Sequence, residues 1–234
     1  MNKFDELEIL FDSKTIKPNF EIVHVILAIL LYGEYPEGLG RYRLESELSV
    51  GSGTAKSLVK RLKDQGSYIK IPTHPKGAIQ EKRRKGHVLT SKGLNLLGKV
   101  KKSIPIISQT DTEFLKEIII TSKGSYSYFC LIKKAIRSLG DGLAQRDAAI
   151  MIGGAGATCL VYDGINIVFP EDYLAKEMDV KININEDIQT YFKTKIMNEN
   201  AVLENGDVII IGIGDKPIKA RLAALNAALT LIKQ

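Results

Sequence analysis

The side chains with the clearest chemistry lie between Arg41 and Gly66, in the sequence RYRLESELSVGSGTAKSLVKRLKDQG. This segment predicts two short helices joined by a turn that contains Gly51 and Gly53. In the second helix, apolar residues recur at i, i+3, i+4 and i+7 from Ala55 to Leu62, and Ser, Thr, Lys and Arg occupy the remaining surface. Hydroxyl and cationic side chains bind bases and phosphates, so we expect this helix to enter a DNA groove.

We expect DNA contacts from three places: the first predicted helix, the second predicted helix and the basic loop that follows them. Arg41 and Arg43 begin the first helix and would hold phosphates. The set expected on the second helix is Ser52, Thr54, Lys56, Ser57, Lys60 and Arg61. The basic loop would place Lys82, Arg83, Arg84 and Lys85 against the DNA backbone. The alternative is a solvated surface, which is the usual role of a lysine-rich helix.

The positive charge of the chain is concentrated in its first half. Residues 1–105 contain 19 Lys and Arg against 11 Asp and Glu, a net charge of +8, whereas the rest contains 14 against 16. Between Arg41 and Lys102, 16 basic and 4 acidic residues give a net charge of +12. Such a local excess favours a polyanionic partner and exceeds what solubility requires.

The elements around these helices predict a complete N-terminal domain over residues 1–105. Residues 19–33 predict a strongly apolar helix, residues 67–90 a hairpin with a long basic tip, and Ser91 begins an amphipathic helix. This order, with the phrases GRYRLESEL, SGTAKSLVKRLKDQG and LTSKG, resembles archaeal and bacterial winged helix-turn-helix transcriptional regulators. The resemblance implies a recognition helix in the major groove and a basic wing on the backbone.

The second half predicts a separate domain over residues 112–234. Residues 113–121 and 126–133 predict one hairpin, residues 157–170 a second, residues 207–214 a buried strand and residues 217–233 a long helix. One mostly antiparallel sheet covered by two helices makes a two-layer α/β sandwich, so the expected fold class is α+β. The phrases RDAAIMIGGAGATCLVYDG and ENGDVIIIGIGDKPIKARLAALNAAL resemble DUF4443, a GAD-like domain found behind a winged helix in archaeal proteins. That resemblance implies no catalytic residues.

A ligand or anion site is considered at Gly212, Gly214 and Lys216. They lie between the predicted buried strand and the last helix, where free N–H groups and the helix dipole attract anions. The alternative is a plain turn in which glycine lets the helix pack closely on the strand. No GK[ST] follows, which excludes a Walker phosphate loop.

No other group of residues predicts catalysis, a cofactor or a metal. Cys130 and Cys159 lack CxxC spacing and a nearby His, and GGAG from Gly153 lacks the GxGxxG spacing of dinucleotide sites. We therefore expect no enzyme, no cofactor and no metal site. The apolar run over residues 23–31 is too short to span a bilayer.

The sequence thus predicts a cytoplasmic DNA-binding transcriptional regulator whose partner is double-stranded DNA. The strongly apolar helices over residues 21–32 and 217–233 predict a homodimer, and the C-terminal domain is expected to sense a small-molecule effector or to dimerise. Two alternatives stay open: an RNA- or tRNA-associated module, suggested by the GAD likeness, and an enzyme with its site at residues 212–217.

Overall fold

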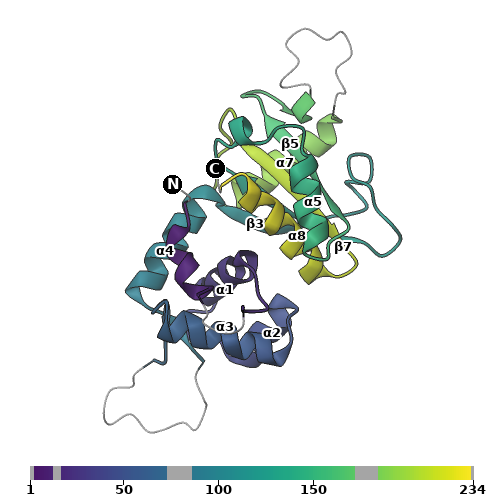
Figure 1. Cartoon of the computed structure of the whole chain (residues 1–234). Helices are drawn as coiled ribbons and strands as arrows, with labels where there is room; N and C mark the ends of the chain where they lie inside the picture. The colour runs from purple at the N-terminus through teal and green to yellow at the C-terminus, as the bar shows by residue number, and fades with distance from the viewer. Residues whose placement is uncertain (1–2, 13–16, 73–85, 172–183, 233–234) are drawn as a thin grey trace. The chain divides into compact units, whose positions relative to one another are not determined.

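The computed structural model describes residues 3–12, 17–72, 86–171 and 184–232, and it combines helices with an open antiparallel sheet (Figure 1). The chain divides into two compact units, residues 4–100 and residues 101–234, and Lys3 groups with the second unit. Within the described residues, each helix is too short or too polar to cross a bilayer.

The N-terminal unit consists of short helices around one apolar helix. Its elements are η1 (Asp5–Leu10), α1 (Ile22–Glu34), α2 (Arg41–Leu48), α3 (Ser52–Asp64), β1 (Ile69–Lys70), β2 (Val88–Leu89) and α4 (Ser91–Ser103), which runs on into the second unit. Every residue of α1 from Val23 to Tyr32 is buried. A helix that is apolar on all sides must be covered on all sides, and α2 and β2 both pack on it.

The first turn of α1 is closed by a capping box that uses a histidine. The backbone N–H of Glu21 donates to Nδ1 of His24 at 3.0 Å, and the Glu21 side chain accepts from the His24 backbone N–H. His24 is buried, and burial lowers its pKa more than the neighbouring Glu21 carboxylate raises it. The folded unit therefore keeps this imidazole neutral, as a hydrogen-bond acceptor.

The C-terminal unit is built on one open sheet in the order β3-β4-β7-β5-β6, with every neighbouring pair antiparallel. The strands are β3 (Ile106–Thr110), β4 (Tyr126–Ile132), β5 (Gly156–Tyr162), β6 (Ile167–Val168) and β7 (Val208–Gly214). The helices are η2 (Ile136–Ser138), α5 (Leu143–Met151), α7 (Glu186–Asn198) and α8 (Pro217–Thr230). All seven residues of the central strand β7 are buried, which requires cover on both faces of the sheet.

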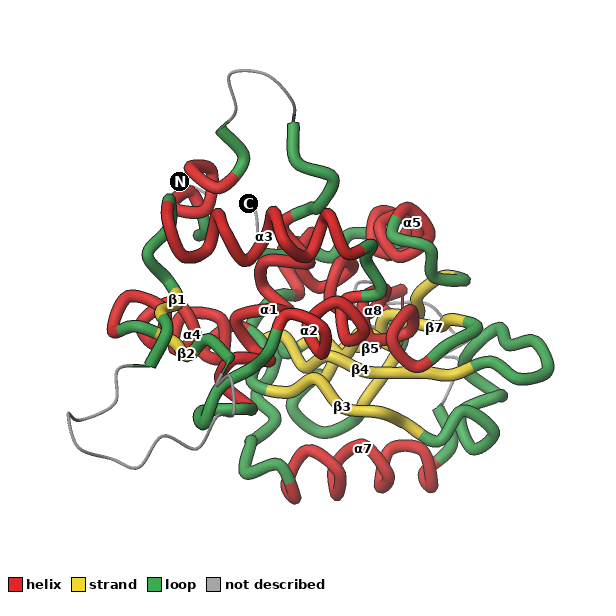
Figure 2. The backbone as a smooth tube through the Cα atoms, turned by 90° about the horizontal axis from the view of Figure 1, so that it is seen from below, coloured by secondary structure: helices red, strands yellow, loops and turns green. Residues whose placement is uncertain are grey.

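Helices cover both faces of the sheet, so the two-layer prediction was wrong and the unit has three layers. On one face α7 packs through Ile188, Phe192 and Ile196 against residues such as Ile209 and Ile211 of β7. On the other face α8 packs on β7 and β4, and α5 packs on α8 (Figure 2). The polar outer surface of α7 obscured its apolar side in the sequence.

The partner of β4 also differs from the sequence prediction. Residues 113–121 form turns around the buried Leu115 and Ile119 rather than a strand, and Asp111 Oδ1 accepts the N–H of Phe114 in the first of them. β4 pairs instead with β3, which lies between the two predicted domains, in residues assigned to neither. Strand pairing is non-local, so a short apolar stretch beside a proline showed no partner in the sequence.

The neutral capping histidine predicts an acid-sensitive N-terminal unit. The pKa of His24 lies below its ordinary value of 6.5 in the folded state. The unfolded chain therefore binds more protons as the pH falls through 6.5, and the free energy of unfolding should decrease. In His24→Gln, an amide oxygen can accept the same bond without titrating.

Thermal unfolding followed by circular dichroism between pH 7.5 and 5.5 measures this effect. His24→Gln should lose less stability on acidification than the natural chain. A residual decrease is expected because burial and Lys63 lower the pKa of His87 as well. Equal pH dependence of the two proteins would contradict the assignment.

Candidate nucleic-acid interface

A tight turn sets the angle between α2 and α3. Ser49 ends α2 in the left-handed region with a φ of 52°, and Gly51 precedes α3 in an extended conformation. Leu44 and Leu48 of α2 are buried, as are Ala55, Leu58 and Leu62 of α3, and the two helices are in contact. The apolar sides of both helices are therefore used in packing, and the opposite side of α3 is left to solvent.

The solvent side of α3 is a row of small polar and cationic residues. Ser52, Lys56, Lys60 and Lys63 are exposed at successive turns of the helix, whereas Thr54 and Ser57 are half-buried at its flank. Lys63 was not among the residues assigned to DNA, although its spacing from Lys60 places it near the same surface. We call Ser52, Lys56, Lys60 and Lys63 the α3 row.

Arg61 has a structural role that the sequence did not indicate. Its Nη1 donates to the backbone carbonyls of Leu10 and Asp12, each at 2.8 Å, and to Gln65 Oε1 at 3.3 Å. These bonds hold the end of η1 against α3. A guanidinium engaged in this way faces the N-terminal segment, so we remove Arg61 from the set of DNA contacts.

The two arginines at the start of α2 each lie over an aromatic ring. The guanidinium carbon of Arg43 is 3.8 Å from the centroid of the Tyr35 ring, and its Nη2 donates to the Tyr35 hydroxyl. The guanidinium carbon of Arg41 lies 4.8 Å from the ring centroid of Tyr42. Stacking of this kind orders an exposed cation before any ligand binds. Tyr35, which positions Arg43, was missed because it lies outside the predicted helix pair.

A short sheet joins the chain before α2 to the chain before α4. β1 and β2 are antiparallel, and Leu39 pairs with His87 through N–H···O bonds of 2.9 and 3.0 Å in the two directions. A Cβ at Gly86 would collide with the backbone of Leu39, so only glycine permits this approach. Lys82, Arg83, Arg84 and Lys85, assigned to the basic loop, lie outside the described residues.

Gly212 and Gly214 serve close packing of α8 on β7. A Cβ at Gly212 would collide with the backbone of Ala224, and one at Gly214 would lie 2.7 Å from the backbone nitrogen of Ala220. The helix backbone thus occupies the space beside both glycines. Lys216 is exposed just before α8. The plain-turn alternative explains this segment, and the anion site considered from the sequence is not proposed further.

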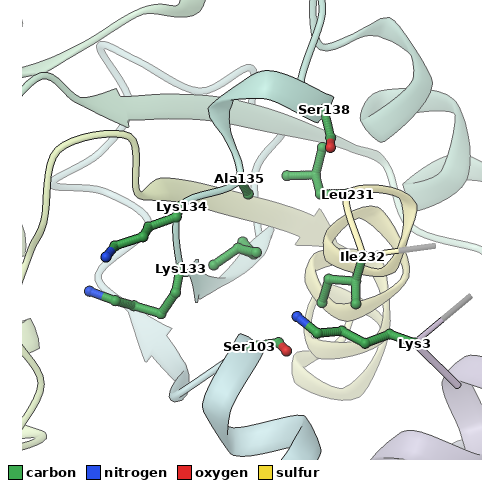
Figure 3. Close-up of a pocket in the computed structure, with 9 residues that line it drawn as sticks. Lys3, Ser103, Lys133, Lys134, Ala135, Ser138, Leu231 and Ile232 are labelled. Atoms are coloured by element: carbon green, nitrogen blue, oxygen red, sulfur yellow. The ribbon is translucent and has the colours of Figure 1, made fainter. Parts of the chain in front are cut away.

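A pocket of about 280 Å³ lies in the C-terminal unit, where Ser103, Ile132, Ala135, Ser138, Leu231 and Ile232 are among its lining residues (Figure 3). Lys133 and Lys134 border it, but their ammonium groups point away from Leu231 and Ile232. Nζ of Lys133 binds the fully buried Asp207 carboxylate at 2.6 Å and the Val202 carbonyl at 2.8 Å. Lys133 is therefore paired with a carboxylate, and Nζ of Lys134 pairs with Glu204 at 2.9 Å, whereas Lys3 also lines the pocket.

Asp207 connects β4 to the segment that precedes β7. Besides Lys133, its carboxylate accepts the backbone N–H of Lys134 at 2.9 Å and that of Glu204 at 2.8 Å. A buried carboxylate with three donors is fully compensated, which is the condition for keeping a charge out of water.

Comparisons with known proteins find a domain match within the second unit and no assigned activity. Residues 123–231 match DUF4443, a domain of unknown function. A comparison with curated proteins finds no match. Among solved structures, the chain is similar to a hypothetical protein from Pyrococcus horikoshii OT3, with a TM-score of 0.60 and 23% identity over 90% of this chain and 91% of that chain. At that identity the likeness concerns the fold alone.

The structural role of Arg61 predicts a stability loss at this position. Arg61→Met keeps the apolar stem but removes the charged hydrogen bonds to Leu10 and Asp12, and should lower the free energy of unfolding by about 1–3 kcal/mol. Lys60→Met, at the adjacent exposed position, should change it by less than about 0.5 kcal/mol. Urea denaturation measures the free energy of unfolding of both variants. Equal values would contradict the structural role of Arg61.

The buried carboxylate predicts a second stability loss. Asp207→Ala leaves Lys133 and two backbone N–H groups without their acceptor, and should cost about 3 kcal/mol because Lys133 retains some contact with solvent. Glu204→Gln is the matched control, since this side chain is 46% exposed and should matter much less. A chemical denaturation midpoint unchanged in Asp207→Ala would contradict the role of Asp207.

Proposed function

We propose that residues 4–100 are a winged helix-turn-helix domain that binds duplex DNA, and that the protein is a cytoplasmic transcriptional regulator without catalytic activity of its own. The order α1, Leu39 bridge, α2, α3, β1, β2, α4 supports this assignment, since such domains place one strand before the helix pair and two after it. In this arrangement α3 is the recognition helix and residues 73–85 link the two wing strands.

The α3 row is the observation that carries the proposal. Its lysines lie on the side of the helix opposite the buried leucines, in a segment whose net charge between Arg41 and Lys102 is +12. Among the described residues, Lys56 and Lys60 form no ion pair with a carboxylate. Lys63, the last residue of the α3 row, pairs with Asp64 at 3.3 Å, whereas exposed lysines outside an ion pair are available to phosphates. Arg41 and Arg43, ordered on their tyrosines, would bind phosphates beside them.

In this proposal each side chain has a definite role. Ser52 and Thr54 lie in the first turn of α3, the part of a recognition helix that reaches base edges. Lys56, Ser57 and Lys60 follow along the helix and would contact bases or the adjoining backbone. The C-terminal unit would then regulate DNA binding through a small-molecule effector or through association of two copies.

Charge reversal on α3 tests the proposal. Duplexes selected by the purified protein from genomic fragments provide the DNA, and fluorescence anisotropy at physiological salt measures its binding. The double variant Lys56→Glu/Lys60→Glu should bind at least about tenfold more weakly and show a shallower salt dependence, because phosphate contacts are lost. Binding equal to that of the natural chain would contradict the assignment.

The matched control changes the same charge on the other unit. Lys116 and Lys123 are exposed residues of the C-terminal unit, so Lys116→Glu/Lys123→Glu alters the net charge of the protein equally. This variant should keep its DNA affinity, and circular dichroism should show that both double variants are folded. Structured RNA is added as competitor, since preferential displacement by RNA would favour an RNA-associated module instead.

A further inference from the structure

Helix α5 presents an exposed row of apolar and charged side chains. Leu143 and Ile150 are each 49% exposed, and Met151 is 79% exposed. Arg146 and Asp147 are exposed between them, on the same side of the helix. We call these five residues the α5 stripe. Three large apolar side chains open to water on one nine-residue helix are a costly arrangement unless something covers them.

The opposite side of α5 packs on α8 of its own unit. Gln145 is buried and its Nε2 donates to Thr230 Oγ1 at 2.7 Å, and Asn226 Nδ2 donates to the Ala148 carbonyl at 2.8 Å. These contacts fix α5 on α8 (Figure 1). The α5 stripe is therefore held rigidly on its helix, as a docking surface requires.

The order of residues in the α5 stripe is self-complementary. From Leu143 to Ile150 the chain reads LAQRDAAI, with an apolar residue at each end and a cation followed by an anion at the centre. If two such helices pack antiparallel around a two-fold axis between residues 146 and 147, Arg146 lies opposite Asp147 of the second copy. Leu143 then lies opposite Ile150. Both kinds of contact occur twice, as an isologous interface demands.

The exposed methionine has a matching hollow at the other end of the same helix. In this register Met151 lies opposite Gly142 of the second copy. Gly142 lines a pocket of about 200 Å³ that also includes Leu143, Arg146 and Phe169. An unbranched methionine side chain adapts well to such a hollow.

We propose that the protein forms a homodimer through antiparallel packing of two α5 helices around an axis between Arg146 and Asp147. The two helices from which dimerisation was expected do not serve this purpose. Residues 23–32 of α1 and residues 222–229 of α8 are already buried in the single chain. A second copy fits the α5 stripe because the two-fold axis places each charge opposite a charge of the other sign and each apolar side chain opposite another apolar side chain.

The size of the α5 stripe sets the expected strength of the dimer. Nine residues of helix span about 14 Å, so α5 alone covers less than a standard interface of about 1,600 Å². Insertion of Met151 into the hollow adds area on both sides of the axis. We expect association in the micromolar range.

Charge reversal at the axis provides a test that needs no DNA. Sedimentation equilibrium should show a dimer of the natural chain at concentrations up to about 100 μM. Arg146→Asp and Asp147→Arg should each raise the dimer dissociation constant at least about tenfold, because like charges then meet across the axis. An equimolar mixture of the two variants should form a heterodimer, because each acidic pair then meets a basic pair.

The double variant Arg146→Asp/Asp147→Arg is the matched control. It keeps the charges in reversed order, so it should dimerise within about threefold of the natural chain. Melting temperatures of all variants separate loss of association from loss of folding. A natural chain that stays monomeric, for example because the α5 stripe packs within one chain, would overturn the proposal. So would a dimer indifferent to both single reversals, or variants that fail to associate on mixing.

Discussion

The C-terminal unit depends on the close approach of one helix to the central strand. β7 is hydrogen-bonded on both sides, to β4 and β5, and all of it is buried. Gly212 and Gly214 lack the Cβ atoms that would keep the α8 backbone away, and Ala220 and Ala224 are the small residues that meet them. Because the backbone of α8 lies so close to β7, the helix is surrounded by protein, and its residues from Leu222 to Leu229 are all buried.

In the N-terminal unit, α1 has the corresponding place. It is apolar on all sides, and α2 and β2 pack on it, while α3 packs on α2. In each unit a largely buried helix therefore supports the fold, and more amphipathic helices lie outside it. The surfaces that remain available for partners belong to those outer helices, the α3 row in one unit and the α5 stripe in the other.

The two proposed surfaces differ in chemistry as their partners do. The α3 row is small, polar and cationic, which suits the edge of a base pair and the phosphates beside it. The α5 stripe is apolar with one charge of each sign, which suits a second copy of itself. A dimer would carry two DNA-binding units, and paired half-sites are the usual targets of such domains. The two surfaces lie on different units and share no residues.

The local pattern of the sequence determined most elements and their burial. The spacing of Ala55, Leu58 and Leu62 predicted α3 and its buried side, and the unbroken apolar run of β7 and the composition of α8 predicted a buried strand and a packed helix. The concentration of charge near α3 also follows from the sequence alone. These features can be predicted because the spacing of apolar residues indicates which side of a helix or strand each residue faces.

What the sequence could not determine was which distant groups meet. The pairing of β4 with β3, the cover of the second sheet face by α7, and the bonds from Arg61 to Leu10 all join segments that no local pattern connects. The same holds for Gly212, where a phosphate turn and a packing glycine have the same sequence. The spacing of apolar residues predicts which side chains are buried. It does not predict which residues they contact, because those contacts depend on how all the elements of the unit pack together.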